Sequence, residues 1–157
     1  MNCAIPRILV SAVILTLAGM PLLAQAQGQT VGSVKTVTGD AWVSTAGQRV
    51  KAQFGTMVFL GSQLKTAKTA SLGVTFKDNT LMSFGPDTEL TVDEYLFAPL
   101  EGKLKFGARL DKGSLNYVSG VIAKLRPDAV NVKTPTGTIG VRGTQFLVKV
   151  DGLSAAN

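Results

Sequence analysis

Apolar and polar residues alternate along almost the whole chain after residue 27, and this period of two limits the folds open to it. In the segment 71–76, for example, every second residue is large and apolar, and the residues between are small or polar. Successive side chains of a β-strand point to opposite faces of a sheet, so the pattern predicts half-buried strands. The many Val and Thr residues favour the same structure. No stretch of eleven residues keeps an apolar period of 3.6, so we expect no long helix.

Turn-forming residues divide this pattern into short segments. Pairs such as Gly39-Asp40 recur roughly every 8–12 residues, a spacing typical of β-sandwiches, barrels and solenoids. We therefore expect an all-β fold, either an antiparallel β-sandwich or an irregular β-solenoid-like domain. A half turn of helix is expected at Tyr95 and Leu96, followed by a loop over 97–102. The expected strands are 31–38, 41–44, 48–51, 71–76, 81–84, 89–92, 103–110, 114–118, 121–125, 129–133, 138–141 and 145–150.

The first 26 residues have the layout of a secretory signal peptide. A short segment with one cation, Arg7, precedes an apolar run over 8–23, and small residues lead to Ala26. This order predicts cleavage after Ala26 and export to the periplasm. The alternative is an uncleaved membrane anchor, but the run is short for a span and Gly and Pro interrupt its end. We expect the signal peptide at 1–26, one domain over 27–157 and no stable membrane span after cleavage.

The residue types that most enzymes use are scarce. The chain has no His, and its single cysteine, Cys3, lies in the expected signal peptide. The secreted part therefore lacks an imidazole base, a His/Cys zinc site, a Ser-His-Asp set and a disulfide. Glycoside hydrolysis needs two facing carboxylic acids, and the adjacent Asp93 and Glu94 would point to opposite faces of a strand. A calcium loop of alternating acids is missing as well. We expect no enzymatic activity, no metal and no cofactor.

The chain is basic, with 16 Lys and Arg against 10 Asp and Glu and a formal charge of +6. Removal of the signal peptide takes away one charged side chain, Arg7, and leaves +5. Surplus cations spread along a strand-rich chain are typical of a solvated surface, and export argues against a nucleic-acid partner. An anionic surface of the cell envelope stays open as a partner.

Arg142 and Thr144 are two candidate binding residues near the end of the chain. Arg142 is a cation between glycines on an otherwise apolar path. Its guanidinium could cap carbonyls or pair with a carboxylate, for which Asp78, Asp87 and Asp111 are candidates. Alternatively, it could contact an anionic partner, such as a carboxylate or an acidic glycan.

Trp42 is the third candidate binding residue. Together with Tyr95 and Tyr117 it could form an aromatic platform for sugar rings. A Trp flanked by apolar residues in a strand is more often partly buried, with its N–H bonded to a partner. Both interpretations stay open at this point.

A basic face is expected on the strand 103–110 and just after it. Lys103, Lys105, Arg109 and Lys112 alternate in part with apolar residues. The pattern predicts an amphipathic strand with a basic outer face, which commonly protects the edge of a sheet.

Four short blocks resemble the FecR domain family, and they occur in the family's order. The blocks are LGSQLKT at 60–66, FKDNTL at 76–81, KGSL at 112–115 and KTPTGTIGVRGTQF at 133–146, and the last is the most specific. Ser62 stands where the family often has Asp, and Asn79 stands where Gly is common. Asn tolerates positive φ, so the second change is mild. The resemblance covers about 58–150 and implies the fold and the periplasmic compartment of that domain.

The resemblance also implies a protein partner. FecR regulators carry a cytoplasmic anti-sigma segment and one transmembrane helix before this domain, and here a signal peptide takes their place. We therefore expect the resemblance to carry the domain's binding role and not transmembrane signalling. The favoured function is non-catalytic protein–protein recognition in envelope signalling or assembly, through a partner strand that adds to an open sheet edge. The alternative is a module that binds peptidoglycan or another envelope polysaccharide.

Overall fold

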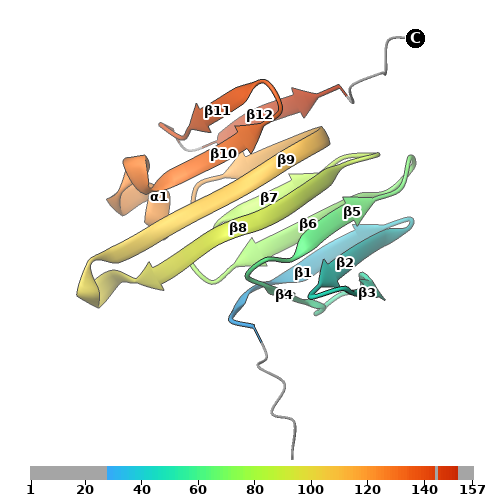
Figure 1. Cartoon of the computed structure of the whole chain (residues 1–157), viewed down its shortest axis with the longest axis horizontal. Coiled ribbons are helices and arrows are strands. Elements are labelled where there is room, and N and C mark those ends of the chain that lie inside the picture. Colours follow the sequence, from blue (N-terminus) through green and yellow to red (C-terminus); the bar gives the residue numbers. More distant parts are fainter. Residues whose placement is uncertain (1–27, 144, 152–157) are drawn as a thin grey trace, which may run out of the picture.

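The computed structural model describes residues 28–143 and 145–151, and the all-β prediction is confirmed (Figure 1). The expected signal peptide lies outside these residues. No helix within them is long and apolar enough to cross a membrane. The strands are β1 (Thr30–Thr38), β2 (Ala41–Thr45), β3 (Gln48–Lys51), β4 (Met57–Phe59), β5 (Gln63–Thr66), β6 (Ser71–Phe76), β7 (Leu81–Phe84), β8 (Glu89–Ala98), β9 (Lys103–Val118), β10 (Val130–Thr134), β11 (Gly137–Gly140) and β12 (Gln145–Val150). The helical elements are η1 (Pro99–Glu101), α1 (Val121–Leu125) and η2 (Pro127–Ala129).

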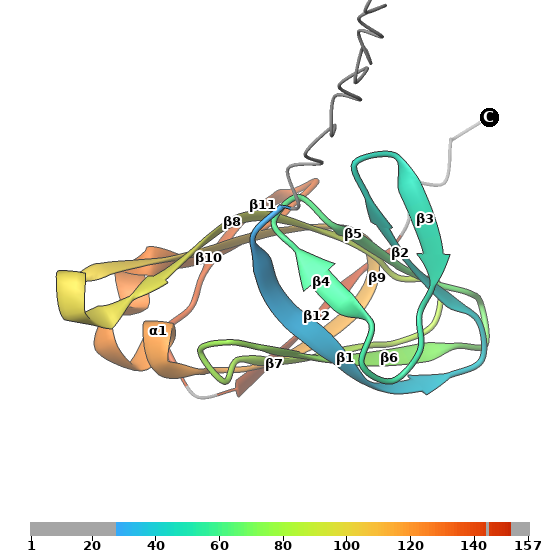
Figure 2. The same ribbon diagram turned by 90° about the horizontal axis from the view of Figure 1, so that it is seen from below.

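The strands form one curled sheet that folds into two facing layers (Figure 2). Its main path runs β3-β2-β5-β8-β9-β7-β6-β1-β4. β9 belongs to both layers, because β8 and β10 flank its first half and β7 and β12 flank its second half. The β9–β10 pair is parallel, whereas β9 is antiparallel to its other three neighbours. The two layers of the expected sandwich therefore come from one continuous sheet.

β9 serves both layers because it bends at Gly113. The φ angle of Gly113 is +92°, a conformation that glycine adopts without steric cost. Thr88 packs against the bare Cα, and its Oγ1 accepts a hydrogen bond from the Ser114 N–H at 3.0 Å and donates to the Gly85 carbonyl at 2.9 Å. The sequence predicts two strands separated by this glycine. The structure instead shows one strand of 16 residues that changes direction there.

The core lies between the two layers, and a chain of aromatic rings runs through it. The Phe76 and Phe106 rings meet edge to face with centroids 5.0 Å apart, and Phe106 meets Tyr117 at 6.1 Å. Tyr117 stacks on Phe146 of β12 at 4.9 Å. These residues come from β6, β9 and β12, so the aromatic contacts join both layers of the sheet.

Residues 121–125 are helical, and the prediction of a strand there is wrong. The Val121 N–H donates to the main-chain oxygen of Asp78 at 2.7 Å, and the Ile122 N–H donates to the Asp78 carboxylate at 3.4 Å. Pro127 has no N–H to continue the helix, and α1 ends two residues before it. The apolar run predicts a strand from its local pattern, but the acceptors that favour the helix come from a turn 44 residues before Ile122.

Two other local predictions are wrong. Tyr95 and Leu96 lie in β8, which extends to Ala98, so no half turn of helix forms there. The expected loop after them is reduced to η1 and Gly102. Two short strands, β4 with three residues and β5 with four, form where the sequence pattern predicts none.

Candidate functional site

The segment 133–146 contains two of the three predicted binding residues, Arg142 and Thr144. The structure describes the first of them. The segment contains the end of β10, the whole of β11, with which β10 forms a hairpin, and the start of β12. Thr134 Oγ1 donates to the Gly137 carbonyl at 2.9 Å and closes the hairpin turn. Val141 is buried in the core at the end of the hairpin. Thr144 lies outside the described residues.

Arg142 lies on the surface beside Asp128, with its Nη2 4.0 Å from the Asp128 Oδ1. The two side chains are 89% and 90% exposed, so water and salt screen the pair and leave it little stabilising effect. The predicted partners lie elsewhere: Asp78 is buried, and Asp87 and Asp111 form ion pairs with other cations. The prediction that one of these three acids pairs with Arg142 is wrong, because Asp128 of η2 lies beside Arg142 instead.

A shallow hollow of about 380 Å³ lies beside Arg142. Pro127, Val130 and Val141 contribute apolar surface to it, and Asp128 and Arg142 contribute charge. Because its guanidinium is exposed, Arg142 is accessible to an anionic group of a partner. The same exposure makes it a peripheral contact and not the centre of a buried site.

The three aromatic residues of the suggested sugar platform do not share a surface, so that interpretation is wrong. Trp42 is half-buried in β2, and the Arg49 guanidinium stacks on its ring 4.2 Å from the centroid. This cation–π contact covers one face of the ring. Tyr95 and Tyr117 are buried in the core. The partial burial of Trp42 agrees with the alternative interpretation.

Burial raises the pKa of both tyrosines. The pKa of Tyr95 is raised well above its usual value by burial first and by the negative charge of Asp78 second. Burial raises the pKa of Tyr117 to about 12, and the charge of Asp78 adds to the effect. These are the two tyrosines of the whole protein.

Alkaline titration should therefore report unfolding. The unfolded chain ionises its tyrosines near pH 10, whereas the folded chain resists until about pH 12. A raised folded-state pKa leaves stability unchanged below about pH 10 and lowers it as the pH rises from there to about 12. We expect the absorbance of tyrosinate at 295 nm to rise in one cooperative step with loss of the fold. A gradual rise while near-ultraviolet dichroism is unchanged would contradict the burial of the rings.

Asp78 is a buried carboxylate held by hydrogen bonds. It accepts from Thr80 Oγ1 at 2.7 Å, the Thr80 N–H at 3.3 Å, Tyr95 Oη at 3.2 Å and the Ile122 N–H at 3.4 Å. Among the described residues no Lys or Arg lies within 4.0 Å of it. These contacts join the turn after β6 to β8 and α1, so Asp78 has a structural role. The Asp-x-Thr spacing, typical of a turn in which Asp bonds the main chain two residues on, is the sequence signal for it.

The basic segment 103–112 lies on β9 in the middle of the sheet, so the prediction that it protects an edge is wrong. Its cations pair with acids on its outer face, as Lys105 does with Glu94 at 3.1 Å and Lys112 with Asp87 at 2.9 Å. The hydrogen bond from Lys112 lowers the pKa of Asp87 and raises that of Lys112. The charges of this strand are therefore matched within the sheet.

Four strands are paired on one side within the described sheet, and they differ in how well they are protected. β3 carries Arg49 and Lys51, β4 has three residues, and β11 begins and ends with Gly. β12 has six residues and one charge, Lys149, and Leu147 is 74% exposed. Short length and charge are the usual protection of an edge, so β12 is the least protected of the four. We call its unpaired side the β12 edge.

The β12 edge also has an incompletely covered apolar face. Phe146, Val148 and Val150 point towards the core and are partly buried, whereas Leu147 points outwards. β12 pairs with β9 along its whole length, which fixes the register of these side chains. A strand added beside β12 would extend the layer and cover the three inward side chains further. The sequence shows this alternation, but it does not show that β12 is an edge.

Comparison with known protein families gives a match over more than half of the chain. The profile of the family described as FecR protein matches residues 62–156. This range contains three of the four sequence blocks and most of the remaining one. No curated protein and no solved structure gives a significant match to the chain.

Proposed function

This chain belongs to the FecR family, and we propose that it is a non-catalytic binding domain that recognises a protein partner in the periplasm. The compartment rests on the signal-peptide pattern of residues 1–26. The process would be envelope signalling or assembly. The observation that carries the proposal is the β12 edge.

Strand addition is the recognition mode that this edge supports. A strand paired on one side leaves every second N–H and C=O pointing outwards without a main-chain partner. An extended segment of another protein can bond to these groups and continue the sheet. The hydrogen bonds supply affinity that does not depend on the partner's sequence, and the side chains beside them supply specificity.

The side chains of β12 define the partner segment. On the inner face, Phe146 and Val148 favour apolar residues at alternate positions of the added strand. On the outer face, Leu147 favours a further apolar residue, and Lys149, whose exposed ion pair with Asp151 is weak, favours an acidic one.

Leu147→Lys should abolish partner capture without unfolding the protein. The side chain is exposed and points away from the core, so a cation there costs little stability, but it replaces the apolar contact with the partner by a second charge beside Lys149. The matched control is Leu100→Lys, because Leu100 is fully exposed in η1, far along the chain from β12. Purified wild type and both variants would be used to capture proteins from envelope extracts, with identification by mass spectrometry.

We expect one protein to be retained by wild type and by Leu100→Lys and lost with Leu147→Lys. Hydrogen exchange of residues 145–150 should slow in the purified complex. Retention of the same protein by Leu147→Lys, or unchanged exchange in β12, would rule out the β12 edge as the binding site. Recovery of no specific protein would count against the function itself.

A further inference from the structure

The surplus positive charge of the protein is concentrated on a few cations. All ten Asp and Glu residues lie in the described part of the chain; nine of them form ion pairs and the tenth, Asp78, is buried. Within that part, seven cations have no carboxylate oxygen within 4.0 Å. They are Lys35, Arg49, Lys68, Lys77, Lys124, Arg126 and Lys133.

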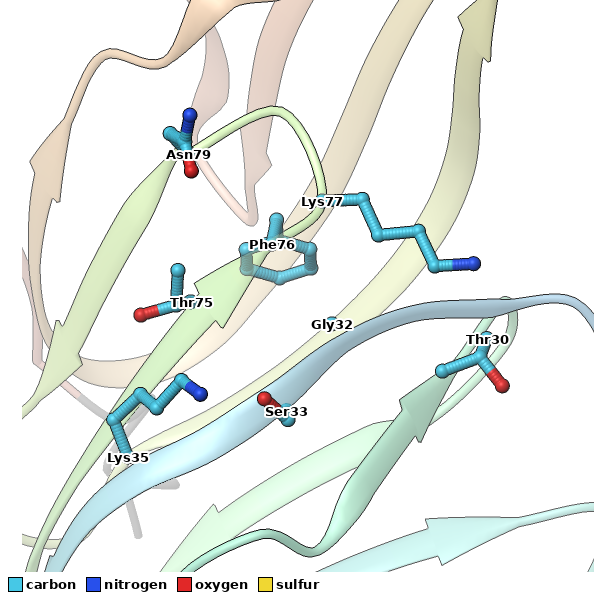
Figure 3. A pocket seen from close by; sticks show the side chains of 8 residues that line it. All are labelled: Thr30, Gly32, Ser33, Lys35, Thr75, Phe76, Lys77 and Asn79. Carbon is cyan, nitrogen blue, oxygen red and sulfur yellow. The ribbon is translucent and has the colours of Figure 1, made fainter.

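Two of these seven, Lys35 and Lys77, line the same hollow, which we call the Lys35–Lys77 hollow. It has a volume of about 250 Å³ and lies over β1 and the end of β6. Figure 3 shows the two side chains on opposite sides of Gly32. Lys35 also lies near the Phe54 ring, with its Nζ 5.8 Å from the centroid. Two unpaired ammonium groups at one concave site attract an anion more strongly than either does alone.

The other polar side chains of the hollow are free to bind a ligand. Thr30, Ser33, Thr75 and Asn79 line it, and none of their side chains takes part in a hydrogen bond with the described chain. Three of them are hydroxyls, which donate and accept, and the fourth is an amide. The site therefore offers several short neutral groups together with two cations.

The main-chain N–H and C=O groups of β1 at the hollow already pair with neighbouring strands. β1 pairs with β4 on one side and with β6 on the other, through residues that include Gly32 and Ser33. An extended peptide would find no free ladder of N–H and C=O groups there. Recognition at this site must therefore proceed through side chains, in contrast to the β12 edge.

We propose that the Lys35–Lys77 hollow binds an acidic saccharide, with its carboxylate attracted by the two lysines at the rim and ring hydroxyls on Ser33, Thr75 and Asn79. A carboxylate matches the pair of ammonium groups, and a ring rich in hydroxyls matches side chains that both donate and accept. The volume suits one sugar residue. The site lies outside the β12 edge, so saccharide and protein partner could bind together.

The test is a titration of the full secreted chain, labelled with ¹⁵N, with methyl β-D-glucuronide at low ionic strength. We expect the amide signals of residues 30–35 and 75–79 to shift. Methyl β-D-glucoside, which differs by the missing carboxylate, should shift them far less. Added salt should weaken the binding, because the cations are at the surface.

Variants separate the two parts of the site. In Lys35→Gln/Lys77→Gln we expect affinity for the glucuronide to fall roughly tenfold or more, since two charge-assisted contacts are lost. Lys68→Gln/Lys133→Gln removes the same charge from residues outside the hollow and should leave affinity unchanged. Ser33→Ala/Thr75→Val should weaken binding of the glucuronide and leave binding of inorganic phosphate unchanged.

Three results would overturn the proposal. The first is no shift with the glucuronide, and the second is equal weakening by both lysine pairs, which would indicate a general charge effect. The third is tighter binding of phosphate or of a Glu-rich peptide than of the glucuronide at the same residues. Thermal unfolding of each variant would show that a loss of binding is not a loss of fold.

Discussion

Asp78→Ala is expected to lower the melting temperature by about 10 °C or more. The substitution leaves four donors without their acceptor, in Thr80, Tyr95 and Ile122, and all four are buried with the carboxylate. Each buried donor left without a partner costs about 1–3 kcal/mol, so the free energy of unfolding should fall by about 3 kcal/mol or more. Thermal unfolding followed by circular dichroism would measure the change.

Two further variants identify the cause. Asp128→Ala removes an exposed carboxylate whose ion pair is weak, and the melting temperature should stay within about 2 °C of wild type. Asp78→Asn keeps the size of the side chain and one acceptor oxygen. Its NH₂ group is a donor and cannot accept from the donors that faced the second carboxylate oxygen, so an intermediate loss is expected. A loss for Asp78→Ala as small as that for Asp128→Ala would show that the hydrogen bonds of Asp78 do not stabilise the fold.

Gly113→Ala should destabilise the protein by about 3 kcal/mol or more. At φ +92° an alanine is strained, and its Cβ would lie 2.7 Å from the Thr88 Cβ and closer still to the Thr88 Cα and Oγ1. Part of the overlap is with main chain, so a side-chain rotation does not relieve it. Chemical denaturation would measure the loss of unfolding free energy.

Gly47→Ala is the matched control for the effect of φ alone. Gly47 has φ +80°, and nothing lies within 4 Å of a Cβ built on it. We expect this variant to lose about 1 kcal/mol. If the two variants lose the same amount, the close approach of Thr88 to the bend is not what requires glycine at residue 113.

The sequence predicts strands well where the local pattern determines the structure. It predicts them poorly where contacts with distant residues determine it. Residues 71–76 and 145–150 have clear alternation, and each forms the strand expected. Residues 121–125 have the same apolar character, but hydrogen bonds to Asp78 make them helical. Gly113 marks a break in the pattern, yet the pattern does not distinguish a turn from a bend within one strand.

The candidate site is harder to predict from the sequence than the fold is. Whether β12 is an edge depends on which strands pair, and pairing joins segments far apart in the chain. The pairing of Arg142 with Asp128 and the separation of Trp42 from both tyrosines also depend on the tertiary fold. Similarly, Lys35 and Lys77 line one hollow because β1 and β6 are neighbours, although 41 residues lie between them in the sequence.

The shared strand β9 has a consequence for how the molecule is completed during synthesis. A chain made from its N-terminus can assemble β1 to β8 on one side of β9 before β10 and β12 exist. Until residues 130–150 arrive, the longest strand of the protein is an open rim of 16 residues, a template for attachment to other nascent chains. The last strands therefore cover this exposed edge. A chain truncated before residue 130 should aggregate.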